Sequence, residues 1–128
     1  MDTRTRLGLL LAISVALSAR PGAAQAPAGV TPALITQGDS IFHGKGNCYA
    51  CHGSNAQGTV GPNLTDAEWL HSDGSYDAIV KQVTTGVPKE QSKSGIVMPP
   101  RGGSTITDDE VKAVAAYVYS LSHKKAGA

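Results

Sequence analysis

The sequence predicts one small domain built mainly of helices. Three segments place apolar residues at helical spacing: 34–46, 75–85 and the segment that follows Thr107. No strand-helix-strand pattern surrounds the two cysteines of the chain, Cys48 and Cys51. The 128 residues are 41% hydrophobic, 16% charged and 5% aromatic, a composition that suits one small soluble domain with few large core-filling side chains.

Residues 1–24 are typical of an export signal. Arg4 and Arg6 precede the apolar run 7–17, and small residues then lead to a predicted cleavage site after Ala24. The run is shorter than the roughly 20 apolar residues that span a bilayer, although an uncleaved anchor remains the alternative. We therefore expect a periplasmic or otherwise exported protein.

Charge excludes two classes of partner. Removing Asp2, Arg4, Arg6 and Arg20 from 11 basic and 10 acidic residues leaves 8 and 9, a net charge of −1. Such a surface has neither the basic stripe of nucleic-acid-binding proteins nor a polybasic membrane patch. We expect a monomer with no nucleic-acid partner and no membrane span in the mature chain.

Proline and glycine divide the mature chain into short pieces. Residues 25–33 form a flexible lead-in, 34–123 form the domain, and 124–128 form a C-terminal tail. Before the closing helix, the sequence predicts two longer helices, one short helix and two loops. The predicted segments are a first helix at 34–46, an irregular loop at 53–63, a short helix at 66–70, a helix at 75–85 and an extended loop at 88–104.

Local capping signals mark the last two long helices. Ser75 can cap the helix that begins there, and Gly86 ends it. Thr107 and Glu110 form a capping box, and negative charge in the first turn suits the helix dipole. Apolar residues then recur at helical spacing up to Leu121, which predicts an amphipathic closing helix.

The stretch CYACHG at 48–53 carries the main chemical signal. Cys48 and Cys51 are one helical turn apart, so both sulfur atoms can face one edge of a flat ligand while His52 points toward its face. Haem has matching chemistry, because its two vinyl groups accept thiols and its iron accepts an imidazole. A thioredoxin-like pair, half of a zinc site and a structural disulfide are the alternatives, and the disulfide leaves His52 without a task.

Four motifs together resemble class I c-type cytochromes. They are CYACHG at 48–53, GPNL at 61–64, GIVMPP at 95–100 and AAYVYSL at 115–121. The resemblance implies an all-α cytochrome c fold, a small helical domain wrapped around one haem c that is attached covalently through Cys48 and Cys51. The resemblance also implies that the first and last helices cross beside the haem. In that crossing, Gly38 and Phe42 would meet the last helix near Val114 and Tyr117.

The iron ligands are predicted to be His52 and Met98. Met98 is the one methionine left after signal removal, and Pro99 behind it favours an extended backbone. A thioether favours ferrous iron and so raises the reduction potential. Core filling is the alternative role for Met98, and His71 is its main competitor as ligand. The resemblance further implies that the carbonyl of Pro62 accepts a hydrogen bond from a ring N–H of His52 and so completes the cofactor-binding residues.

Three aromatic or basic residues have two roles open to them. Trp69 and Tyr76 can pack on the porphyrin and reach a propionate, or they can be core residues whose donors bond to backbone. Arg101 can pair with a propionate or face the solvent.

The resemblance implies electron transfer without a catalytic residue. We expect a diffusible periplasmic carrier, not an enzyme, whose donor and acceptor proteins dock weakly at the haem edge near Cys48 and Cys51. One alternative is a haem c subunit docked on a dehydrogenase or terminal oxidase, because residues 62–88 are similar to haem domains of haem-copper oxidase subunits. The others are a haem enzyme or gas sensor with an open iron site and a thiol oxidoreductase.

Overall fold

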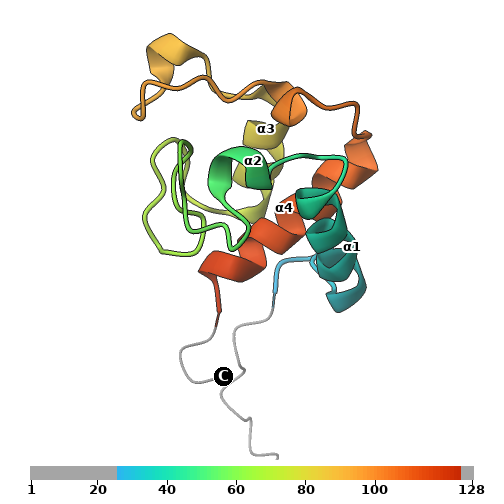
Figure 1. Ribbon diagram of the computed structural model, residues 1–128. Helices are drawn as coiled ribbons and strands as arrows, with labels where there is room; N and C mark the ends of the chain where they lie inside the picture. Colours follow the sequence, from blue (N-terminus) through green and yellow to red (C-terminus); the bar gives the residue numbers. More distant parts are fainter. Residues whose placement is uncertain (1–25, 125–128) are drawn as a thin grey trace, which may run out of the picture.

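The computed structural model describes residues 26–124, and over that range the domain is helical, as predicted (Figure 1). The predicted signal at 1–24 and most of the predicted tail lie outside the described residues. Within the described range no strand forms, and one antiparallel bridge joins Val87 to Met98. The helices are α1 (Pro32–His43), α2 (Tyr49–His52), α3 (Tyr76–Thr85), α4 (Asp108–Ser122) and the short 3-10 helices η1 (Lys89–Gln91) and η2 (Pro100–Gly103).

Helix α1 starts and ends earlier than its apolar pattern predicts. The hydroxyl of Thr31 accepts a hydrogen bond from the backbone N–H of Leu34, and Pro32 occupies the first turn, where its missing N–H costs nothing. The helix ends at His43 because Gly44 leaves helical geometry. The predicted end at residue 46 is therefore wrong by one turn. Residues 44–46 lead into the cysteine motif instead.

The main packing contact of the domain is between α1 and α4, which lie side by side in Figure 1. Gly38 faces the backbone of Ala113 and the Cβ of Tyr117, so the two helices approach closely. The ring centroids of Phe42 and Tyr117 are 5.3 Å apart in an edge-to-face arrangement. Phe42 and Val114 are both fully buried. This crossing confirms the arrangement that the resemblance implied.

The predicted caps of α3 and α4 are confirmed. The hydroxyl of Ser75 accepts from the N–H of Ala78 at 3.3 Å. The hydroxyl of Thr107 accepts from the N–H of Glu110 at 3.3 Å, and the Glu110 carboxylate accepts from the N–H of Thr107 at 2.9 Å. Glu110 also pairs with Lys45, which ties the loop after α1 to the start of α4.

Two predictions about the intervening segments are wrong. Residues 66–70 form bends and no helix, because the Asn63 and Asp66 side chains accept from backbone N–H groups two residues ahead and so stabilise turns. The segment 88–104 is not wholly extended but contains η1 and η2. In Figure 1 it runs across the top of the view, above α2 and α3.

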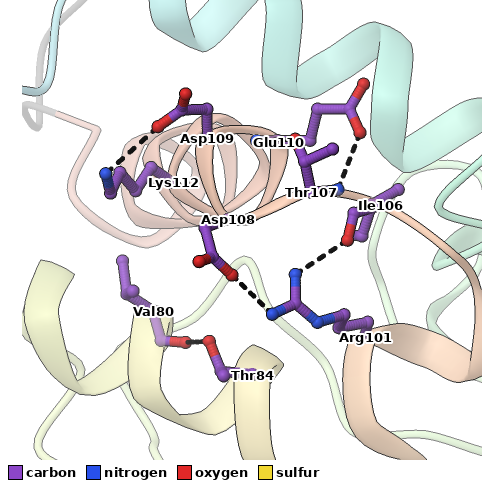
Figure 2. A network of polar contacts seen from close by, with 9 residues as sticks. All are labelled: Val80, Thr84, Arg101, Ile106, Thr107, Asp108, Asp109, Glu110 and Lys112. Carbon is purple, nitrogen blue, oxygen red and sulfur yellow. Dashed lines mark hydrogen bonds and ion pairs between the residues drawn. The ribbon is translucent and has the colours of Figure 1, made fainter.

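Arg101 fixes the join between η2 and α4 (Figure 2). Its guanidinium donates to the carbonyl of Ile106 at 2.7 Å and to the carboxylate of Asp108 at 2.5 Å. That bond is the main reason why the pKa of Asp108 lies below its usual value. The backbone of Arg101 adopts a left-handed conformation, with φ at 55°. Because of the two hydrogen bonds, both terminal nitrogens of its guanidinium are bonded to protein groups.

In the part of the chain that the structure describes, no helix combines the length and apolar character needed to cross a membrane.

Candidate cofactor site

A cleft lined mainly by apolar side chains opens between the cysteine motif, α3, α4 and the segment around Met98. It contains about 1070 Å³ of empty space, part of it open to solvent. A mainly apolar cleft with a few polar groups is typical of cofactor sites. The structure brings all five predicted site residues to this cleft: Cys48, Cys51, His52, Pro62 and Met98.

The two cysteines occupy the short helix α2 and its first flanking position. Cys48 is the N-cap residue and Cys51 lies in the last turn, with Cys48 partly buried and Cys51 exposed. Burial raises the pKa of the Cys48 thiol to about 11. A thiol–disulfide oxidoreductase needs a thiolate, which requires a lowered pKa, so this environment argues against that alternative.

His52 ends α2 and is held in one orientation. Its Nδ1 lies 2.8 Å from the carbonyl oxygen of Pro62. A carbonyl can only accept, so Nδ1 carries the proton and donates it. Burial, partly opposed by the Pro62 carbonyl, lowers the pKa of His52. The imidazole is therefore neutral near pH 7, and its Nε2 keeps a free lone pair.

Pro62 reaches His52 because the loop after α2 is tied back onto the motif. The N–H of Gly61 donates to the carbonyl of Cys51 at 2.8 Å, and the N–H of Gly58 donates to the carbonyl of His52 at 2.7 Å. A Cβ at Gly61 would lie 3.1 Å from both Cε1 and Nδ1 of His52, tighter than most Cβ contacts. Glycine at 61 lets the loop pass against the imidazole ring.

Met98 is positioned through its backbone. The N–H of Val87 donates to the carbonyl of Met98 at 2.8 Å, and the N–H of Met98 donates to the carbonyl of Val87 at 2.9 Å. Met98 therefore lies in an antiparallel bridge and outside any helix, as the following Pro99 predicted. Gly86 precedes the bridge with φ at 69°, and a Cβ there would lie 2.8 Å from the Pro100 nitrogen. Gly86 before the bridge and Pro99 after it thus help to hold Met98 at the cleft.

The structure distinguishes the residues for which the sequence left two roles open. Tyr76 donates its hydroxyl to the carbonyl of Lys112 at 3.2 Å, and Arg101 is bound as described above, so both are engaged by the protein. Trp69 and His71 line the cleft. The Nε2 of His71 accepts from the backbone N–H of Lys93 at 3.0 Å, so it is engaged with the loop between α3 and Met98.

Gln82 is a cleft residue that the sequence interpretation missed. It lines the cleft from α3 beside Ile79 and Val83. The available signal was its place on the same face of a predicted helix as two apolar residues, where a polar side chain is unusual. That signal was weak because a glutamine on a short helix is more often solvated.

The donor set fits haem c. Two thiols, a neutral imidazole with a free nitrogen and a thioether all reach one largely apolar cleft. Imidazole and thioether are the ligand pair of iron in c-type cytochromes. Among residues 26–124, no three His, Cys, Asp or Glu side chains lie close enough to hold a metal ion by themselves.

Comparisons with known proteins agree with this geometry. The family model described as cytochrome c oxidase, cbb3-type, subunit III, matches residues 33–118. A CcoP subunit of a cbb3-type cytochrome c oxidase from Rubrivivax gelatinosus is 40% identical over 92 residues, covering 71% of this chain and 27% of that protein. A FixP subunit from Rhizobium meliloti is 41% identical over 103 residues, covering 76% of this chain and 30% of that protein. The chain thus spans less than a third of the length of these relatives.

A solved structure shows the same architecture. Cytochrome cL from Methylophaga aminisulfidivorans superposes with a TM-score of 0.56 at 25% identity, over 70% of this chain and 56% of that one. The fold is therefore that of cytochrome c, and the cysteine pair is consistent with one covalent haem c. The chain belongs to the family of cytochrome c oxidase, cbb3-type, subunit III, and has the fold of a cytochrome c domain.

Proposed function

We propose that the chain carries electrons through one haem c bound covalently by Cys48 and Cys51, with His52 Nε2 and the Met98 sulfur as iron ligands. The observation that carries the proposal is the bond from His52 Nδ1 to the Pro62 carbonyl, which leaves Nε2 free in the cleft that both thiols and Met98 also line. When bound, haem c supplies an iron that accepts and returns one electron.

Each residue has a defined task in this proposal. The Pro62 carbonyl orients His52 and raises its basicity as a ligand. Met98, a soft uncharged ligand, favours the ferrous state and raises the reduction potential. The apolar lining of the cleft would exclude water from a bound haem. If His52 and Met98 both held the iron, no coordination position would be left for an external substrate, which would favour a carrier over a haem enzyme or gas sensor.

We further propose that the protein acts outside the cytoplasm and that its acceptor is a terminal oxidase. Covalent haem attachment and the export signal expected at 1–24 support the compartment. The relatives are named as subunits of cbb3-type oxidases, which supports the acceptor. A free carrier and a subunit bound to the oxidase are both compatible with a domain that spans less than a third of those relatives.

The cofactor is tested on the exported protein. Mass spectrometry should show an addition of one haem, and Cys48→Ala/Cys51→Ala should lose it. The oxidised protein should show a near-infrared sulfur–iron band, which Met98→Ala should abolish while making the reduced iron accessible to carbon monoxide. A protein without the haem addition, or a wild type that binds carbon monoxide at neutral pH, contradicts the proposal.

The acceptor is tested with the native haem protein. Membranes that contain a cbb3-type oxidase should oxidise the reduced protein, and membranes from a strain lacking that oxidase should not. Copurification with the oxidase after mild detergent extraction indicates a subunit, whereas recovery in the soluble fraction indicates a diffusible carrier. Equal oxidation by both membrane preparations contradicts the proposed acceptor.

A further inference from the structure

The amide of Gln82 stands out because it lacks a partner. Among residues 26–124, its Oε1 is the one buried side-chain polar atom without a hydrogen-bond partner. Leaving such a group unpaired costs free energy, so buried polar atoms are nearly always satisfied. Gln82 lines the cleft that would hold the haem. A partner supplied by the bound cofactor would remove this cost.

The surroundings of Gln82 indicate which part of the cofactor lies there. A second, more polar hollow adjoins the cleft, and His71, Gln82 and Val87 line both. Neither cysteine lines this second hollow. Gln82 therefore lies where the cleft meets polar surroundings, away from the residues that would anchor the vinyl edge. The groups of a haem that require polar surroundings are its two carboxylates.

The cleft also lacks a cation to pair with those carboxylates. No lysine or arginine of the described chain lines it. Arg101, the basic residue that the sequence offered for this role, donates to Ile106 and Asp108 instead (Figure 2). Lys81 lines the adjoining hollow but not the cleft, so a carboxylate held within the cleft has no lysine or arginine beside it and depends on other side-chain donors, of which Gln82 is one.

We propose that the side-chain amide of Gln82 donates a hydrogen bond to a propionate of the bound haem, an inference that rests on the proposed function. Rotation of the amide by half a turn exchanges its oxygen and nitrogen without changing its shape, which places Nε2 at the buried position. A neutral donor facing a carboxylate makes a charge-assisted bond, roughly twice as strong as a neutral one. Gln82 is then a positioning residue that fixes the haem and lessens the effect of the propionate charge on the iron.

The test uses haem-loaded Gln82→Leu, with Gln91→Leu as the matched control. Gln91 is exposed and lines only the outer hollow. In Gln82→Leu the propionate bending bands of the resonance Raman spectrum should shift. The reduction potential should also fall, because a less neutralised carboxylate stabilises ferric iron. Gln91→Leu should keep wild-type values of both.

Two outcomes overturn the inference. Unchanged propionate bands in Gln82→Leu show that the amide does not contact the carboxylate. A shifted near-infrared sulfur–iron band with unchanged propionate bands assigns the amide to Met98 instead. If Gln82→Leu does not fold, Gln82→Glu provides the test, since a second carboxylate facing the propionate should lower the potential and an unchanged potential refutes the contact. Both readouts are taken only on variants whose visible haem spectrum matches that of the wild type. Failure of the proposed function would instead be seen as a wild-type protein without haem.

Discussion

Gly38→Ala tests whether the crossing of α1 and α4 depends on a missing side chain. A Cβ at Gly38 would overlap the carbonyl oxygen of Ala113 and would lie 2.6 Å from its carbonyl carbon and 2.8 Å from the Cβ of Tyr117. Ordinary contacts begin at 3.4 Å, so the carbonyl carbon alone requires a separation of about 0.8 Å, and the overlapping oxygen requires more. The obstructing atoms of Ala113 are backbone atoms, which cannot move aside as a flexible side chain could.

The cost follows from the packing that this gap disrupts. A gap of 0.5–1 Å forfeits about a quarter to a half of the dispersion energy between facing atoms. Removing a buried Phe side chain costs about 3–5 kcal/mol, so the gap takes about 1–2 kcal/mol from Phe42, and Val114 and its buried neighbours lose a similar total. Alanine is favoured over glycine within a helix by about 0.5–1 kcal/mol, which opposes this loss. The net destabilisation should be about 1–3 kcal/mol.

The sign of the change decides between helix propensity and steric overlap. Guanidinium chloride unfolding of the haem-loaded protein, followed by circular dichroism, measures the free energy of unfolding. Gln37→Ala, at an exposed position on the same helix, should stay within about 0.5 kcal/mol of wild type. A Gly38→Ala protein as stable as wild type, or more stable, refutes the close approach of the two helices.

Three further predictions concern the site and its supports. Gly61→Ala should displace the His52 ring, weaken its bond to the carbonyl acceptor and make the imidazole a poorer electron donor, which raises the potential in a spectroelectrochemical titration; an unchanged potential contradicts this. Arg101→Ala should destabilise the fold by about 1 kcal/mol through its lost hydrogen bond to a backbone carbonyl, measured by denaturant unfolding, while its exposed ion pair contributes little. His43 should titrate above 6.5 by NMR of the reduced protein, because the Ser54 carbonyl accepts from Nε2 and the imidazolium is favoured. Since the folded pKa of His43 is raised, its contribution to stability should be complete below pH 6.5 and lost as pH rises through the folded pKa, and a titration at or below 6.5 would exclude this.

Local signals in the sequence predicted more than distant ones. The caps at Ser75 and Thr107 depend on residues three positions apart, so the sequence alone predicts them. The helix expected at 66–70 does not form because Asn63 and Asp66 offer the backbone a competing turn, and apolar spacing carries no information on that competition.

The site shows the same division between local and distant information. Cys48, Cys51 and His52 belong to one motif, which the sequence shows directly. The structure shows that they line one cleft together with Pro62 and Met98. Their roles as haem attachment points and iron ligands stay predictions. Gln82 escaped the sequence analysis because an unpaired buried amide is a property of three-dimensional packing and leaves no spacing pattern along the chain.

The pairing of α1 with α4 also governs the order in which the molecule can be assembled. Synthesis releases residues from the N-terminus at about 5–20 per second, and α4 is the last helix to emerge. Until it does, Gly38 and Phe42 have no helix to pack against, and the cleft lacks the wall that Val114 and Val118 supply. The final helix therefore closes both the α1 contact and the cleft, and a chain truncated before Asp108 should leave the cleft open even where its cofactor is attached covalently.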